Sequence, residues 1–295
     1  PLFVNDLACF LGQSVALVVG ETYEACRAGV AAVSAEWKPL PAITTLDAGL
    51  AAGQFLSEPH LLQRGDVEGA LAEASLRLSG EIRTGAQDHF CLETQVTLAV
   101  PEEGGTVKLH CSTQHPAEVQ SIVAQVLGWG RHQVVVEVPR LGGGFGGKET
   151  QAAPFAAMAA LAAVKTGRPV KVWLNRDQDM AQTGKRHPFL TRYQAGFTRA
   201  GELTALKLDL YADGGFSNDL SRAILDRALF HCDNAYWVPS LRFEGRVVKT
   251  NLPSNTAFRG FGGPQGMAVV EEILSRAAES LQLDPSEVRR KNFYG

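Results

Sequence analysis

The stretch Leu141–Thr150 reads LGGGFGGKET, and five of its ten residues are glycine. An apolar run, Val134–Val138, precedes it, and an alanine-rich segment, Gln151–Lys165, follows it. This pattern predicts a strand that leads through a glycine loop into a helix. Glycine adopts positive φ at little cost and lets backbone N–H groups approach a ligand closely, so the loop is a candidate binding cradle.

A second glycine loop, Arg259–Gly266, reads RGFGGPQG and shares the core GFGG with the first. The first loop is not a Walker phosphate loop, because Lys148 is followed by Glu149 and not by Ser or Thr, and no early βαβ unit gives it a Rossmann context. Either loop alone is compatible with an ordinary turn. Two loops with the same core, each bordered by a charged residue, favour a pocket that both help to form.

Composition narrows the class of protein. The chain has 295 residues, is 45% hydrophobic and 20% charged, and carries a net charge of -3, which argues against a general nucleic-acid or membrane-surface binder. No apolar run approaches the ~20 residues that span a bilayer. Five cysteines are scattered without a C-x-x-C pair. They predict reduced thiols in a cytoplasmic protein and speak against a disulfide framework, a zinc site or an iron–sulfur cluster in this chain.

Strands and helices alternate without a strict βαβ rhythm, which predicts an α+β fold. We expect a small αβ module up to Gly53, with strands at Ser14–Val19 and Ala35–Lys38 around a helix at Glu21–Ser34. A polar connector over residues 54–75 should follow, running along the surface. The strands expected after it are Leu76–Ile82, Val96–Val100, Thr106–Cys111, Arg131–Val138, Val170–Leu174, Thr191–Phe197, Leu203–Ala212 and Leu241–Thr250, and the helices are Glu118–Leu127, Gln151–Lys165, Met267–Leu281 and one that begins at Asp284.

Two charged residues are candidates for ligand contact. Glu149 follows the first glycine loop, where a carboxylate can position a ligand or exchange protons with it. The alternative is a first-turn acid that complements the helix dipole. Arg227 lies in a partly apolar segment, so it needs an acceptor, and a substrate oxygen would serve. The alternative is an internal salt bridge with Asp226 or Asp233.

Three further residues stand at loop or strand ends. Arg259 can donate to a cofactor oxygen and Phe261 can stack on a flat ring; the alternatives are a surface charge and a core ring. Gln114 ends a strand, where its amide can bind a ligand or make a turn. We interpret His89, His187 and His231 as structural or surface histidines, because their spacing suits no metal site.

Several long stretches of the sequence resemble those of a known enzyme family. Most of the chain from Leu76 resembles the molybdenum-cofactor portion of the molybdenum hydroxylases, the family of xanthine dehydrogenases and aldehyde oxidases. Residues 11–53 resemble the end of a hammerhead-type α/β domain, and residues 76–295 the first part of the molybdopterin-binding domain. The matching stretches are LETQVTLAVPE (92–102), CSTQHP (111–116), RLGGGFGGKET (140–150), KTGRPVKVWLNRDQDM (165–180), TGKRHPFLTRY (183–193), LDRALFHCDNAY (225–236) and KTNLPSNTAFRGFGGPQG (249–266).

The resemblance assigns roles to the candidates. Gln114, Phe145 and Arg259 match residues around the molybdenum, and Gly144 and Gly146 belong to the loop beside the cofactor. Glu149, Arg227 and Phe261 match residues that bind a purine, with the first two also serving the reaction. Aldehyde oxidases typically lack equivalents of Glu149 and Arg227, so the pair favours xanthine or hypoxanthine.

The implied activity is hydroxylation of a purine ring carbon with oxygen from water, as part of a larger oligomeric complex. FAD and [2Fe-2S] clusters are expected on other segments or subunits, as are the rest of the molybdenum domain and the general-base glutamate, so the chain is expected to be inactive alone. Two alternatives stay open. One is a molybdenum hydroxylase for aldehydes or other N-heterocycles, and the other is a non-catalytic assembly module.

Overall fold

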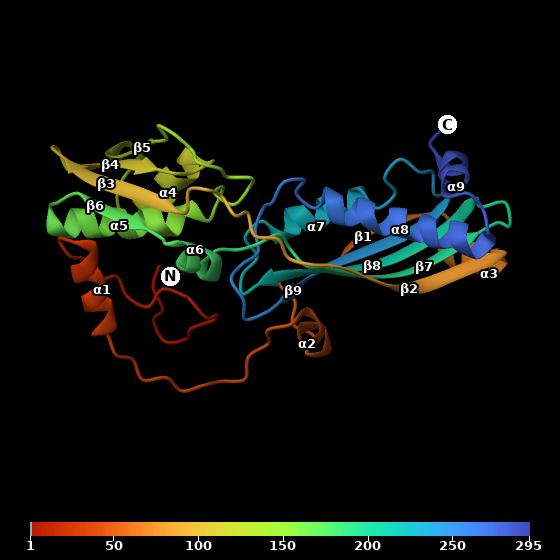
Figure 1. The fold of residues 1–295 in the computed structure, drawn as a ribbon, viewed down its shortest axis with the longest axis horizontal. Coiled ribbons are helices and arrows are strands. Elements are labelled where there is room, and N and C mark those ends of the chain that lie inside the picture. The colour runs from red at the N-terminus through yellow and green to blue at the C-terminus, as the bar shows by residue number, and fades with distance from the viewer. Residues whose placement is uncertain (1) are drawn as a thin grey trace. The chain divides into compact units, whose positions relative to one another are not determined.

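The computed structural model describes residues 2–295, which divide into two compact units (Figure 1). The first unit contains the described residues up to Ile43, Asp88–Gly184 and Asn251–Thr256. The second contains Thr44–Gln87, Lys185–Thr250 and Ala257–Gly295. The chain therefore passes between the units several times, and each unit is described by itself.

A four-stranded mixed sheet forms the centre of the first unit, in the order β5-β4-β3-β6. The central strands β3 and β4 pair antiparallel with Ala99 opposite Leu109, and β5 joins β4 in parallel. These elements are β3 (Val96–Glu102), β4 (Thr106–Cys111), β5 (Val134–Glu137), β6 (Val170–Trp173), α4 (Pro116–Leu127), α5 (Ala152–Thr166), α6 (Arg176–Gln182) and a short 3-10 helix, η1 (Arg131–Gln133).

The alanine-rich helix α5 packs directly on this sheet. Ten of its residues are buried, and eight of these ten are alanines. Small side chains let the helix backbone approach the strands closely, and the helix is apolar on nearly every side, as expected for a buried helix. The glycine loop lies between β5 and α5, as the sequence predicts.

The second unit contains a five-stranded mixed sheet in the order β1-β9-β8-β7-β2. Strands β8 and β9 run parallel, and the other neighbouring pairs are antiparallel. The elements are α2 (Leu46–Ala51), β1 (His60–Arg64), α3 (Val67–Glu73), β2 (Leu76–Thr84), β7 (Phe189–Phe197), β8 (Leu203–Gly215), α7 (Ser221–Phe230), β9 (Ser240–Lys249), α8 (Gly263–Leu281) and α9 (Pro285–Asn292).

Both faces of this sheet are covered, as the alternation along β8 shows. Leu206, Leu208 and Leu210 are fully buried in the main core with residues of α7 and α8. Ala205, just before these leucines, contacts α3 residues, and Tyr211, just after them, packs in the cluster of α2. Successive side chains of a strand point to opposite faces. Helices α7 and α8 therefore cover one face, and α2 and α3 cover the other (Figure 1).

Helices α7 and α8 pack so closely that the position of Gly266 has room for no residue larger than glycine. A Cβ atom added at Gly266 in α8 would lie 2.2 Å from the carbonyl oxygen of Ala228 in α7. We expect Gly266→Ala to lower the free energy of unfolding by about 2–3 kcal/mol, because the two backbones must separate. A thermal unfolding midpoint tests this. Gly85→Ala is the control, because its new Cβ would meet no atom within 4 Å, and an equal loss in both variants would contradict the explanation.

Some sequence predictions are wrong. Residues 14–19 and 35–38 form no strand, because neither has a neighbouring strand in the described chain to share backbone hydrogen bonds; the helix between them is α1 (Tyr23–Ala31). The expected surface connector, residues 54–75, instead contributes strand β1 and helix α3 to the second unit. Val67 and Leu71 of α3 are buried against Ala205, so this segment is part of the core.

Candidate functional site

The two GFGG loops share an unusual backbone conformation. Phe145 and Phe261 have φ of 51° and 48°, and the glycines that follow them have φ of 99° and 93°. Positive φ costs a non-glycine residue roughly 1–2 kcal/mol, so such residues persist where the surroundings impose them. The first loop belongs to the first unit and the second loop to the second unit. The shared sequence therefore reflects a shared local structure.

Glycines of the first loop make room for three side chains. A Cβ at Gly142 would lie 2.4 Å from Glu93 Cβ, one at Gly144 would lie 2.6 Å from Gln114 Cδ, and one at Gly147 would lie 2.5 Å from the His89 ring. Any larger residue at these positions would displace the packed neighbour. The loop is therefore built around Glu93, Gln114 and His89 as much as around a ligand.

The side chain of Gln114 has a defined orientation. Its Oε1 accepts hydrogen bonds from the backbone N–H groups of Gly146, at 2.9 Å, and Lys148, at 3.3 Å. Its own backbone N–H donates to Lys148 O at 2.8 Å. The carbonyl end of the amide is thus used inside the protein, and the two N–H donors of Nε2 are left on an exposed residue. Gln114 both holds the loop and presents a hydrogen-bond donor.

Lys148 lies in a buried polar cluster that the sequence analysis did not identify. The lysine is 2% exposed, and its Nζ donates to Ser112 Oγ at 2.7 Å, to Glu93 O at 2.9 Å and to Glu93 Oε2 at 3.3 Å. Glu93 Oε2 also accepts from Gly142 N–H at 2.9 Å. The cluster ties both ends of the glycine loop to the segment before β3 and the end of β4. Its sequence signal was weak, since a lysine beside glycines is usually exposed.

The Glu93 carboxyl gives this cluster a pH dependence. Burial raises its pKa, but hydrogen bonds from Ser112, Gly142 and Lys148, with the charge of Lys148, outweigh burial and hold the pKa below its usual 4.5. A depressed pKa contributes stability that is present above pH 4.5 and is lost as pH falls through the folded-state pKa. We expect Glu93→Gln to lower the thermal midpoint most above pH 4.5, and we expect the difference from wild type to shrink as the pH falls through the folded-state pKa. A difference that stays constant over this range would contradict the assignment.

Glu149 is half-buried and precedes the helix that follows the loop. Helix α5 begins at Ala152 with Gln151 as N-cap, and its first turn contains no acidic residue. The alternative that Glu149 is a first-turn acid is therefore wrong. Its backbone N–H contacts Gly146 O at 3.4 Å, which keeps it adjacent to the GFGG turn. Phe145, at the centre of that turn, has a ring that is 52% exposed.

Arg227 lies exposed near the end of α7. The alternative of an internal salt bridge is wrong, because across residues 2–295 no carboxylate pairs with it. Asp226 instead contacts His60, and Asp233 accepts from the Tyr294 hydroxyl at 2.6 Å. A Cβ added at Gly263 would lie 3.9 Å from Arg227 Nε. The guanidinium is therefore next to the second glycine loop.

The other two candidates of the second unit belong to that loop. Arg259 is exposed, and Phe261 is partly buried against the main core. Arg186 holds this loop through two contacts. Its Nη2 donates to Arg259 O at 2.8 Å, and its guanidinium lies 4.0 Å from the centre of the Phe258 ring. The second unit thus brings Arg227, Arg259 and Phe261 together, and the first unit brings Gln114, Phe145 and Glu149 together.

The histidines agree with the sequence interpretation. His187 is fully buried, with Nε2 2.7 Å from Ser221 Oγ, and His231 Nδ1 lies 2.8 Å from Arg227 O. Within residues 2–295, no group of three or more His, Cys, Asp or Glu side chains could hold a metal ion. No helix in this part of the chain is long and apolar enough to cross a membrane.

Residues 54–293 match the molybdopterin cofactor-binding domain family, and the chain belongs to this family. It is 45% identical over 293 residues to a xanthine dehydrogenase of Dictyostelium discoideum and 46% identical over 294 residues to a xanthine dehydrogenase/oxidase of Mus musculus. In both comparisons the match covers 99% of this chain and 22% of the relative. The chain thus spans about a fifth of the length of these relatives.

A solved structure has the same fold. The quinoline 2-oxidoreductase of Pseudomonas putida 86 superposes with a TM-score of 0.91 at 27% identity, over 99% of this chain and 39% of that one. The mixed architecture with two mixed sheets is therefore that of the molybdopterin-binding domain of molybdenum hydroxylases. The predicted resemblance to the molybdenum-cofactor portion of this family is confirmed.

Proposed function

We propose that this chain forms part of a molybdenum centre that hydroxylates purines, converting hypoxanthine to xanthine and xanthine to urate. The observation that carries the substrate assignment is Arg227, an exposed guanidinium next to the second glycine loop that forms no ion pair within residues 2–295. Such a group is available to a substrate oxygen, and an arginine is an effective donor to developing negative charge. The xanthine dehydrogenase names of the two relatives support the same substrate class.

The residues present fit a molybdopterin cofactor. Gln114 Nε2 offers two N–H donors on an exposed side chain, and the GFGG loop beside it has no side chain at Gly144 or Gly146 to obstruct a ligand. When bound, the molybdenum cofactor supplies the redox chemistry and carries the oxygen from water. We assign Gln114, Gly144, Phe145, Gly146 and Arg259 to its environment, with Gln114, Phe145 and Arg259 around the metal.

Glu149, Arg227 and Phe261 would bind the purine. A purine presents both N–H and C=O edges, so it needs an acceptor and a donor, which Glu149 and Arg227 provide. Phe261 would contact the flat face of the ring. Arg227 gains most when negative charge builds on the purine, because the interaction then becomes charge-assisted at both ends. The general base is not assigned to Glu149 and is expected elsewhere in the polypeptide or complex.

Because the chain spans about a fifth of its relatives, we propose the rest of the assembly from the family resemblance. We infer that residues 1–53 are the end of a hammerhead-type α/β domain and residues 76–295 the first part of the molybdopterin-binding domain. Electrons would leave through [2Fe-2S] clusters to FAD on other segments or subunits of an oligomer. The five free cysteines support a cytoplasmic enzyme.

The experiment uses the intact protein that contains this chain. We expect purified protein to contain molybdenum and pterin and to form urate from xanthine. Quinoline and benzaldehyde are the competing substrates, since a structural neighbour is named as a quinoline oxidoreductase. Faster turnover of either one than of xanthine would favour the alternative molybdenum hydroxylase. Intact protein without molybdenum and pterin would favour the non-catalytic assembly module.

A further inference from the structure

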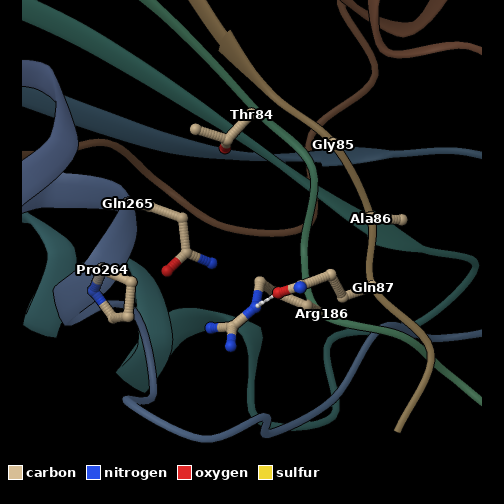
Figure 2. A pocket seen from close by; sticks show the side chains of 7 residues that line it. All are labelled: Thr84, Gly85, Ala86, Gln87, Arg186, Pro264 and Gln265. Atoms are coloured by element: carbon tan, nitrogen blue, oxygen red, sulfur yellow. Dashed lines mark hydrogen bonds between the residues drawn. The ribbon is translucent and has the colours of Figure 1, made fainter. Parts of the chain in front are cut away.

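Figure 2 shows a cavity in the second unit whose lining includes none of the residues proposed to bind the cofactor or the purine. Its volume is about 330 Å³, at the lower end of the range for small-molecule sites. It lies where the end of β2, the residues before β7 and the start of α8 meet. The lining residues are Thr84, Gly85, Ala86, Gln87, Arg186, Pro264 and Gln265.

Three polar side chains of this cavity have buried atoms that find no hydrogen-bond partner among the described residues, 2–295. They are Thr84 Oγ1, Arg186 Nη1 and Gln265 Oε1. Gln265 is 3% exposed, so water does not compensate its carbonyl from outside. Unpaired buried polar atoms are rare in folded proteins, and each needs an explanation. Three around one cavity indicate a polar occupant.

The charge at the cavity is positive and uncompensated. Arg186 donates through Nε to Gln87 Oε1 at 2.7 Å (Figure 2). Its Nη2 donates to Arg259 O, so both partners are neutral. Over residues 2–295, no carboxylate forms an ion pair with it, and burial lowers the pKa of its guanidinium. The Phe258 ring against its face fixes the group in place. A half-buried, fixed arginine without an acid favours an anion.

The start of helix α8 adds to this field. The helix has 19 residues and begins at Gly263, so Pro264 and Gln265 of the cavity lie in its first turn. The N–H of Gly263 already donates to Gly260 O at 3.0 Å, and Pro264 has no N–H. The helix therefore acts through its dipole, which stabilises negative charge at this end. The helix dipole, the arginine and the threonine hydroxyl thus all stabilise negative charge in the cavity.

We propose that this cavity binds a small tetrahedral oxyanion of the phosphate type. Arg186 Nη1 and the Thr84 hydroxyl donate to its oxygens, and Gln265 Oε1 accepts from the hydroxyl that hydrogen phosphate retains. The three atoms are shielded from solvent, so binding includes small side-chain rotations that bring them to the cavity surface. Sulfate has no hydrogen to donate and binds less well, because it leaves Gln265 unpaired.

Occupation of the cavity acts on the second glycine loop. Arg186 holds that loop through Arg259 O, and Pro264 and Gln265 belong to it. An anion bound to Arg186, Thr84 and Gln265 therefore joins the loop to the end of β2 and reduces the mobility of the loop. Slower hydrogen exchange in a peptide covering residues 258–266 is the expected signature.

Equilibrium dialysis of the intact protein against radiolabelled inorganic phosphate, at constant ionic strength in chloride, tests the proposal. We expect one saturable site per chain, with sulfate competing several-fold less effectively than phosphate. Arg186→Met should weaken phosphate binding about 10-fold or more, because it removes a charge-assisted hydrogen bond. Thr84→Val, which removes a single hydroxyl, should weaken it less and provides a second variant if Arg186→Met misfolds.

Arg199→Met is the matched control, because it removes an exposed arginine without an ion pair from the same unit. It should leave phosphate affinity unchanged. Glycerol 3-phosphate, a dianion near neutral pH with no phosphate hydrogen for Gln265, should compete as weakly as sulfate; competition as strong as that of phosphate overturns the role of Gln265. Phosphate binding that is unsaturable, or equal in wild type, Arg186→Met and Thr84→Val, overturns the proposal. Molybdenum content and urate formation are measured separately, so failure here is distinct from failure of the proposed function.

Discussion

Replacing Arg227 with methionine should lower kcat/KM for xanthine by about 10²–10³-fold in the intact enzyme, through loss of one preorganised donor to the transition state. Methionine keeps the length and apolar stem of arginine and removes the guanidinium. The effect should fall more on kcat than on KM, because the interaction strengthens as negative charge develops on the purine. Turnover of benzaldehyde, which has no second oxygen or ring N–H edge, should fall much less.

Two variants control this result. Arg222→Met removes an exposed arginine from the same helix, α7, so it reproduces the change in net charge and helix composition. It should leave both activities unchanged. Arg227→Lys keeps the charge and loses the planar fork, so it should recover part of the activity. If Arg227→Met slowed xanthine and benzaldehyde equally, Arg227 would be a structural residue and the purine assignment would lose its main support.

The sequence predicted the strands after residue 75 and the helices α4, α5, α8 and α9 well, because each carried a strong local signal, but it missed helices α6 and α7. Strand β4 at Thr106–Cys111 follows a Gly-Gly turn, and α9 begins at Pro285 after an Asp284 N-cap, as expected. The alanine-rich α5 was evident from composition alone. In these segments local propensity and tertiary packing favour the same structure.

Strand β1 and helix α3 were missed as well, because they depend on distant partners. Strand β1 has five residues and pairs with β9, which lies about 180 positions later. The neighbouring sequence therefore contains no signal that predicts this strand. Helix α3 buries Val67 and Leu71 alone, which is too few for a clear helical period. The reverse error, a predicted strand at residues 14–19, arose because apolar composition cannot tell whether a partner strand exists.

For the candidate site, the sequence identified residues but not their hydrogen-bond partners. Residue type and spacing identified Gln114 and the GFGG loops, but not which end of the Gln114 amide faces outward. That depends on two backbone donors, at Gly146 and Lys148, whose positions the fold determines. Likewise the sequence left an ion pair open for Arg227, and the structure resolves it by giving Asp226 and Asp233 other partners. Hydrogen-bond assignment is a tertiary property, so it had to come from coordinates.

Lys148→Met should destabilise the first glycine loop by about 3 kcal/mol, the lower end of the cost of removing one partner from a buried ion pair. The lower end applies because Glu93 keeps Ser112 and Gly142 as donors and its side chain is 36% exposed. Local opening of the loop should then rise about 100-fold, since 1.4 kcal/mol corresponds to a factor of ten. Hydrogen exchange of a peptide covering residues 140–150 in the intact protein measures this opening.

The same variant should reduce molybdenum content, because an open loop no longer fixes the Gln114 amide. Lys165→Met is the control, as this lysine is exposed in the last turn of α5 and its loss changes the net charge equally. The double variant Lys148→Met/Glu93→Gln separates two causes. If the cost comes from a carboxylate left without its cation, removing the charge of Glu93 as well should restore part of the protection. If the double variant is as open as the single one, the lysine acts through packing and its bond to Ser112, and the ion pair is not what holds the loop.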